Sequence, residues 1–216
     1  MQIPIIYEDD DVAVIDKPAG ILVHPVLNEK NTLLDFLKIK YPDVKIVHRL
    51  DRDTSGLMVV AKNEKIYEWL KSQFLNREIL KKYLALVIGN FKDKKGIIVK
   101  SISKSRKRGG RQTIAPIGKR REAITRYEVI KEFENYSLLE VSPETGRTHQ
   151  IRVHLASIGH PIVGDEKYKF KRQPVLKGSN RQFLHASYLQ FKMPDGNIKE
   201  FHSELSEDLN KVLEKL

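Results

Sequence analysis

The segment HRLDRDTSG, residues 48–56, places one carboxylate among cations in a run whose residues are typical of a turn. Asp51 follows His48 and Arg49 and precedes Arg52 and Thr54. Backbone N–H groups and hydroxyls in such a turn orient a carboxylate, and nearby cations favour its ionised form. An ionised carboxylate beside cations can act as a nucleophile or general base on an anionic substrate. The same residues also fit a surface turn with a solvated cluster of ion pairs, so spacing alone leaves both interpretations open.

The run DRDTS, residues 51–55, also matches part of the D-x-D-x-T signature of phosphohydrolases that form an aspartyl phosphate. Such a site needs an apolar strand leading into the first aspartate and a downstream acidic pair for Mg²⁺. Here the lead-in Val47-His48-Arg49-Leu50 is polar, and the nearest downstream match is Asp165-Glu166. Ser55 stands where the signature has threonine. The sequence therefore disfavours this chemistry.

A second group of titratable residues lies in ETGRTHQIRVHLASIGHP, residues 144–161. On a helix, His149 and His154 would lie about 140° apart, so they would ligate one metal ion poorly. We therefore expect no metal here, and expect these histidines and His160 to be hydrogen-bonded structural groups. Arg147 and Arg152 form either a basic helix face or partners for a buried carboxylate or a phosphate.

The overall composition favours a polyanionic partner. The 216 residues include 39 Lys and Arg against 28 Asp and Glu, a formal charge of +11. Such a balance favours RNA, DNA or an anionic membrane surface as the partner, although it also fits a protein that is basic without such a partner. Cysteine is absent, which excludes disulfides and thiolate catalysis and fits a reducing compartment. With no apolar run of about 18 residues and an acidic N-terminal stretch, we expect a cytoplasmic protein without membrane contact.

Apolar periodicity predicts an α+β fold with a mostly antiparallel central mixed sheet flanked by helices. The expected strands lie within residues 3–20 (two strands), 45–47, 57–62, 81–89, 123–133, 136–143 and 182–193. The expected helices lie within residues 31–42, 63–78, 146–159 and 203–216. Thr32 and Asn63 are the expected helix N-caps. No linker is evident, so we expect a single domain over residues 1–216.

One segment departs from this pattern. From Lys100 to Arg126 the chain has ten basic residues against the single acid Glu122, with Gly109-Gly110 in the middle. Such a stretch should bury little and form a long exposed loop or a pair of extended arms. It is a candidate surface for an anionic partner.

Several motifs together resemble those of the RluA-type pseudouridine synthases. They are HRLDRDTSG, KKYLALVIG, GRTHQIRVHLASIGHPIVGDEKY and RQFLHASYLQF, in this order, and the opening DDDVAVIDKPAGILVHP is similar as well. The resemblance runs from about residue 5 to about residue 200. It implies isomerisation of uridine to pseudouridine in transfer RNA, ribosomal RNA or both, with no cofactor and no metal, in a basic active-site cleft. An RNA-binding protein of the same fold without catalysis is the alternative.

The resemblance also implies roles for individual residues. The catalytic aspartate falls on Asp51, which attacks the target nucleotide at ribose C1′ or uracil C6. The tyrosine that stacks on the target base falls on Tyr83, and the arginine that pairs with the aspartate falls on Arg152, with Arg147 as second choice. Arg49 matches the arginine that enters the RNA stack where the base has flipped out.

The remaining expectations concern RNA contact and assembly. Residues 100–126 are the expected RNA-binding loop, acting on phosphates through a basic cluster. Its members are Arg106, Lys107, Arg108 and Arg111. Compared with many members of the family, the chain is expected to be a short form that lacks an N-terminal S4 domain. We expect it to act as a monomer with RNA as its partner and with no obligate protein partner.

Overall fold

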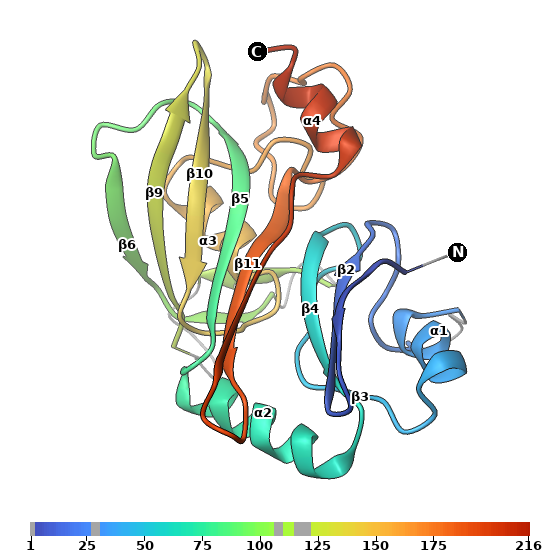
Figure 1. Ribbon diagram of the computed structural model, residues 1–216. Helices are drawn as coiled ribbons and strands as arrows, with labels where there is room; N and C mark the ends of the chain where they lie inside the picture. The colour runs from blue at the N-terminus through green and yellow to red at the C-terminus, as the bar shows by residue number, and fades with distance from the viewer. Residues whose placement is uncertain (1–2, 27–30, 106–109, 115–121) are drawn as a thin grey trace. The chain divides into compact units, whose positions relative to one another are not determined.

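The structure is a computed structural model that describes residues 3–26, 31–105, 110–114 and 122–216. The chain divides into two compact units (Figure 1). The first unit comprises Met1–Lys81 and Ala186–Glu204, and the second comprises Lys82–His185 and Leu205–Leu216. Both contain antiparallel strand pairs and helices, which confirms the predicted α+β class.

The first unit is built on the strands nearest the N-terminus. They are β1 (Ile5–Glu8), β2 (Val12–Lys17), β3 (Lys45–Ile46) and β4 (Ser55–Ala61). β2 pairs antiparallel with β1 on one side and with β4 on the other. Every residue of β4 is buried, as expected for a continuous apolar run in a central strand. The predicted pair of strands around the acidic turn is therefore confirmed.

Two later strands, β11 (Leu184–Lys192) and β12 (Ile198–His202), pair antiparallel and contribute most of their residues to the first unit. β11 lies beside β4, and one glycine permits this approach. Gly56 has φ +111°, and a Cβ there would lie 2.3 Å from the carbonyl oxygen of Ala186. Any other residue would therefore clash with backbone as well as strain its own φ.

Helices α1 (Leu33–Lys40) and α2 (Glu64–Asn76) begin at the predicted caps. Asp35 accepts hydrogen bonds from both the N–H and the hydroxyl of Thr32, and the Asn63 side chain accepts from the N–H of Ile66. α2 ends earlier than predicted because Arg77 adopts a left-handed conformation with φ 62°. Its N–H donates to the carbonyls of Gln73 and Phe74 in the last turn, which ends the helix.

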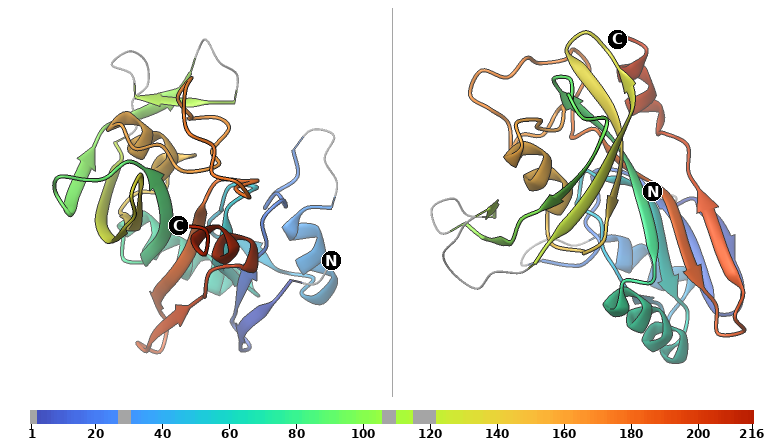
Figure 2. Two further views of the ribbon diagram at one scale, coloured as in Figure 1. Left: turned by 90° about the horizontal axis from the view of Figure 1, so that it is seen from above. Right: turned by 90° about the vertical axis from the view of Figure 1, so that its left-hand side faces the viewer.

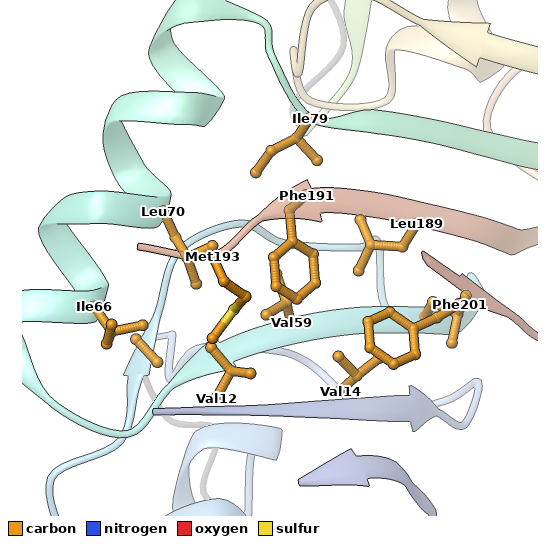
Figure 3. Close-up of a cluster of buried hydrophobic side chains, with 12 residues drawn as sticks. Val12, Val14, Val59, Ile66, Leu70, Ile79, Leu189, Phe191, Met193 and Phe201 are labelled. Carbon is orange, nitrogen blue, oxygen red and sulfur yellow. The ribbon is translucent and has the colours of Figure 1, made fainter. Parts of the chain in front are cut away.

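The hydrophobic core of the first unit lies between α2 and the strands (Figure 3). Ile66 and Leu70, one turn apart on α2, face the apolar side of β4. Phe191 of β11 and Phe201 of β12 stack with ring centroids 5.8 Å apart. This packing holds β4, and with it the HRLDRDTSG segment that leads into the strand, on a rigid support.

The second unit contains a four-stranded antiparallel arrangement in the order β5, β10, β9, β6 (Figure 1). The strands are β5 (Leu80–Ile88, mostly in this unit), β6 (Lys95–Val99), β9 (Ile124–Glu132) and β10 (Tyr136–Pro143). The predicted pairing of residues 123–133 with 136–143 is confirmed, with Val141 opposite both Tyr127 and Tyr83. The strand predicted just before HRLDRDTSG is confirmed as β3, whereas strands β6 and β12 were not predicted.

Part of the basic segment forms a small hairpin, β7 (Ile102–Lys104) paired with β8 (Gln112–Ile114). Figure 2 shows this pair, in light green, apart from the four-stranded sheet and next to the following helix α3 (Gln150–Ser157). The expectation that the segment buries little is wrong at its ends, since Ile102 and Ala123 are buried with Val153. Arg106, Lys107 and Arg108 lie outside the described residues.

α3 covers one face of this sheet (Figures 1 and 2) and starts four residues later than the predicted range. His149 precedes it in a left-handed conformation with φ 55°, so residues 146–149 are not helical. α4 (Glu207–Leu213) buries Leu209 and Val212, as its apolar stripe predicts. Within the described residues, none of the helices has the length and apolarity to span a membrane.

Candidate active site

Asp51 lies in the first unit, in the connection between β3 and β4. Leu50, beside it, is only 4% exposed and anchors the connection in the core. The N–H of Thr54 donates to the carbonyl of Asp51 at 3.2 Å, which closes a turn immediately before β4 begins. Asp51 itself is partly exposed. The carboxylate of Asp51 is therefore held in a closed turn at the start of a buried strand, where solvent can reach it in part.

A buried lysine fixes the other side of this turn. The ammonium of Lys17, at the end of β2, donates to the carbonyls of Pro18, Ile21 and Arg52 at 2.7, 3.1 and 2.9 Å. The N–H of Gly20 donates to the same Arg52 carbonyl at 2.9 Å. Lys17 is 0% exposed, so these carbonyls compensate the cost of burying its charge. The residue after Asp51 is thereby tied to the loop that follows β2.

His48 acts in the opposite way from the sequence-based expectation, which grouped it with the cations. Its Nε2 accepts a hydrogen bond from the N–H of Val59 at 3.1 Å, and its ring stacks on Phe74 at 4.7 Å. Burial, with a smaller contribution from the charge of Lys81, lowers the pKa of His48 to about 3. His48 is therefore neutral and satisfies a strand N–H of β4, which fixes the chain three residues before Asp51.

Arg49 is exposed on the first unit. Burial, together with the charge of Arg49, lowers the pKa of His24 below its ordinary value. His24 lies in the loop that follows β2, so the charge of Arg49 acts on this loop. An exposed arginine can contact phosphate or stack on a base.

The other predicted catalytic residues lie in the second unit. Tyr83 is in β5, where it is 9% exposed and opposite Val141 of β10. Arg152, in the first turn of α3, is 5% exposed and makes a bidentate ion pair with Asp165. Its Nε lies 2.6 Å from Oδ2 and its Nη2 lies 2.9 Å from Oδ1. This geometry fixes the plane of the guanidinium.

Asp165 also organises the turn that follows it. Its Oδ1 accepts the N–H groups of Lys167 and Tyr168 at 2.9 and 3.1 Å. The ring of Tyr168 lies 5.2 Å from the guanidinium carbon of Arg152, within the range of a cation–π contact. The preceding Gly164 has φ +75°, and a Cβ there would lie 2.0 Å from the Arg181 carbonyl. The carboxylate of Asp165 is therefore paired with Arg152. This argues against the phosphohydrolase interpretation, in which Asp165 would bind Mg²⁺.

The start of α3 is fixed by a side-chain network around Gln150. Its Oε1 accepts from the hydroxyl of Thr145 at 2.6 Å and from the N–H of Arg147 at 3.0 Å. Its Nε2 donates to the carbonyl of Ile124 at 2.9 Å and to the hydroxyl of Thr125 at 3.0 Å. Gln150 is 4% exposed, so this amide joins α3 to the ends of β9 and β10.

The three histidines of this region are hydrogen-bonded, as predicted. His149 Nδ1 lies 2.8 Å from the hydroxyl of Tyr168, and His160 Nδ1 bonds the carbonyl of Ile88 at 2.8 Å. His154 bonds Thr125 and the carbonyl of Lys100, and burial lowers its pKa. Among the described residues, no group of three or more His, Asp or Glu side chains is placed to hold a metal ion.

The basic residues divide by their contacts. Arg147 donates from Nε to the carbonyl of Glu122 at 3.1 Å, and Lys100 donates to the carbonyl and hydroxyl of Ser157. Lys104 is exposed and Arg111 partly exposed on the β7–β8 hairpin. The hairpin residues therefore remain candidates for contact with an anionic partner.

Asp51 and Arg49 thus belong to the first unit, and Tyr83, Arg147, Arg152 and Arg111 belong to the second. The pairing of Asp51 with Arg152 stays a prediction. Sequence reasoning missed the structural roles of Lys17, Gln150 and Tyr168. For Lys17, the signal available in the sequence was a lysine at the end of an apolar strand.

Comparison with known proteins identifies the family. The family model for RNA pseudouridylate synthases matches residues 11–157. The chain belongs to this family. It is 39% identical to an uncharacterized RNA pseudouridine synthase, YlyB, of Bacillus subtilis, over 100% of this chain and 73% of that protein. It is also 39% identical to ribosomal large subunit pseudouridine synthase D of Yersinia pestis, over 98% of this chain and 70% of that protein.

A solved structure agrees with this assignment. Human RNA pseudouridylate synthase domain containing 1 superposes with a TM-score of 0.82 at 26% identity, covering 98% of this chain and 87% of that one. The chain therefore has the pseudouridine synthase fold, and it is an RNA pseudouridine synthase, an isomerase of the RluA type. Enzymes of this kind act on RNA, so the basic composition has a physical explanation.

Proposed function

We propose that Asp51 is the nucleophile with which this enzyme isomerises uridines of ribosomal RNA. A carboxylate oxygen of Asp51 bonds to ribose C1′ as the C1′–N1 bond breaks and leaves its electron pair on the uracil. The uracil turns, C5 bonds to C1′ and expels the carboxylate, and the C5 proton is transferred while N1 gains one. Attack at uracil C6 is the alternative first bond. Nothing is consumed, so the reaction needs no redox cofactor.

The observation that carries this proposal is the placement of Asp51. Its turn is closed by Thr54 N–H, and the next carbonyl is bound by Lys17 and Gly20. Such fixing on both sides stabilises the near-attack geometry that a nucleophile requires. Tyr83 is proposed to stack on the flipped base and to assist loss of the C5 proton. Arg152, which is already fixed by Asp165, is proposed to stabilise the ionised nucleophile.

The choice of ribosomal RNA rests on relatives named for the ribosomal large subunit. Transfer RNA is the competing substrate class. Arg49 is proposed to fill the stack vacated by the flipped base, and the exposed hairpin bases Lys104 and Arg111 to contact phosphates, and Arg147 and the basic residues 106–108 are proposed to contribute further contacts with RNA. A protein that modifies ribosomal RNA is expected where ribosomes are assembled, in the cytoplasm. A single copy is expected to suffice.

Tritium release from RNA made with [5-³H]uridine tests the proposal directly. The Asp51→Asn variant should lose at least about a thousandfold in turnover, as expected for removal of a nucleophile. Asp53→Asn, in the same turn and exposed, is the matched control and should retain activity. Equal release by wild type and Asp51→Asn would exclude Asp51 as the nucleophile.

Two further outcomes separate the alternatives. RNA binding by wild type without tritium release would favour the non-catalytic RNA-binding protein. Pseudouridine mapping across cellular RNA, with and without the gene, identifies the substrate. Sites that vanish from transfer RNA alone would contradict the ribosomal assignment while leaving the mechanism in place.

A further inference from the structure

The hydroxyl of Tyr168 joins two elements of the second unit that carry different parts of the proposed function. It accepts a hydrogen bond from the backbone N–H of Gln112, the first residue of β8, at 2.8 Å. It also lies 2.8 Å from Nδ1 of His149, the residue that precedes α3. The basic hairpin and the helix that carries Arg152 are therefore connected through one oxygen atom.

The rest of Tyr168 contacts the arginine site. Its ring lies 5.2 Å from the guanidinium carbon of Arg152. Its N–H donates at 3.1 Å to Oδ1 of Asp165, and that carboxylate holds Arg152 in the bidentate pair. A shift of Tyr168 would therefore change both the ring face and the carboxylate that position the guanidinium.

The hairpin is seated on α3 by a small apolar cluster, which makes the connection a stable one. Ile102 of β7 and Val153 of α3 are buried together, and Ile114 and Tyr168 pack against them. Apolar contacts of this kind resist separation but permit sliding, whereas hydrogen bonds to backbone and imidazole fix direction. The Tyr168 hydroxyl therefore supplies the directional part of the link.

His149 connects the Tyr168 hydroxyl to the backbone of the first turn of α3. It has φ 55°, a conformation that few residues other than glycine adopt and that histidine tolerates better than most. Its carbonyl accepts the N–H of Val153, so its backbone sets the first turn of α3, in which Arg152 lies. Release of its imidazole would loosen the turn that presents the arginine.

We infer that Tyr168 is a positioning residue that couples RNA bound on the β7–β8 hairpin to the placement of Arg152. The inference rests on the proposed function, since it assigns RNA to the hairpin and catalysis to the arginine. RNA phosphates drawn to Lys104 and Arg111 fix the hairpin, and the hydroxyl passes this constraint to His149 and the first turn of α3. RNA binding on the hairpin thereby favours the ordered position of the catalytic arginine.

Tyr168→Phe is the sharpest variant, because it keeps the ring against Arg152 and removes only the hydroxyl. It leaves the Gln112 N–H without that acceptor, and kcat should fall about tenfold with KM nearly unchanged. Tyr136→Phe, which removes a hydroxyl from β10 of the same unit, is the matched control and should leave kcat unchanged. A Tyr168→Phe enzyme with the wild-type kcat would overturn the coupling.

A double-mutant cycle separates coupling from plain RNA affinity. Replacing Lys104 and Arg111 by glutamine should raise KM and lower kcat in the wild-type background. In the Tyr168→Phe background the same replacement should still raise KM but should no longer lower kcat. Losses in kcat that multiply independently would show that hairpin and hydroxyl act separately, and would reject the inference.

Amide hydrogen exchange gives a readout that does not depend on turnover. In Tyr168→Phe the amides of Gln112 and of the first turn of α3 should exchange faster, while those of β9 and β10 stay unchanged. A large-subunit ribosomal RNA transcript should slow exchange in the first turn of α3 in wild type but not in the variant. Equal slowing in both proteins, or none in wild type, would overturn the inference. Wild type that shows this slowing but no tritium release would refute the proposed function alone.

Discussion

The Asp51 turn and the start of α3 are fixed by different kinds of interaction. Around Asp51 the partners are mainly backbone groups, bound by the buried Lys17 and the neutral His48. Around Arg152 they are mainly side chains, including Asp165, Tyr168 and Gln150. Backbone-held turns keep their shape under many substitutions nearby, whereas a side-chain network fails when one member is removed. The two regions should therefore respond differently to substitution and pH.

The largest effect is expected at the ion pair of the second unit. Asp165→Asn removes the charge that compensates the buried Arg152 and should lower the free energy of unfolding by about 3–5 kcal/mol. Chemical denaturation measures it. Asp208→Asn, which breaks the more exposed pair with Arg181, should cost no more than about 1 kcal/mol. Similar losses in the two variants would mean that burial does not distinguish these pairs.

A smaller effect is expected at Lys17 in the first unit. Lys17→Met keeps a long unbranched side chain but leaves the carbonyls of Pro18, Ile21 and Arg52 without this donor. The free energy of unfolding should fall by about 1–3 kcal/mol. Turnover per folded molecule should also fall, because the turn that contains Asp51 loses the hydrogen bond between Lys17 and the Arg52 carbonyl. Lys65→Met, on the exposed side of α2, is the control. A turnover loss no larger in Lys17→Met than in the control would contradict this.

The remaining effect, which is tied to pH, concerns His48. Its pKa of about 3 in the folded protein lies below the ordinary 6.5, so only the unfolded chain gains this proton between those values. Stability from His48 is therefore complete above about pH 6.5 and decreases toward pH 3, by at most about 1.4 kcal/mol per pH unit. His48→Gln should flatten the pH dependence of unfolding in this window, whereas the exposed His202→Gln should not. Parallel curves for all three proteins would rule out a neutral His48 in the folded protein.

Local sequence patterns predicted the elements whose apolar spacing is regular. β2 and α2 lie within their predicted ranges, and β4 begins two residues before its range, because continuous apolar runs favour buried strands and a four-residue repeat favours an amphipathic helix. The β7–β8 hairpin was missed because strands of three residues contain too few positions to establish a period. The end of α2 at Asn76 depends on the left-handed Arg77, which no local preference indicates.

The sequence by itself determined the family, the fold class and the candidate residues Asp51, Tyr83 and Arg152, because short motifs preserve the residue types that chemistry requires. Only the tertiary structure decided that His48 is neutral and that Arg152 pairs with Asp165. The protonation of a histidine depends on desolvation, and the partner of a buried arginine depends on which distant segment the fold brings within about 3 Å. Both are properties of packing, and neither is written in local spacing.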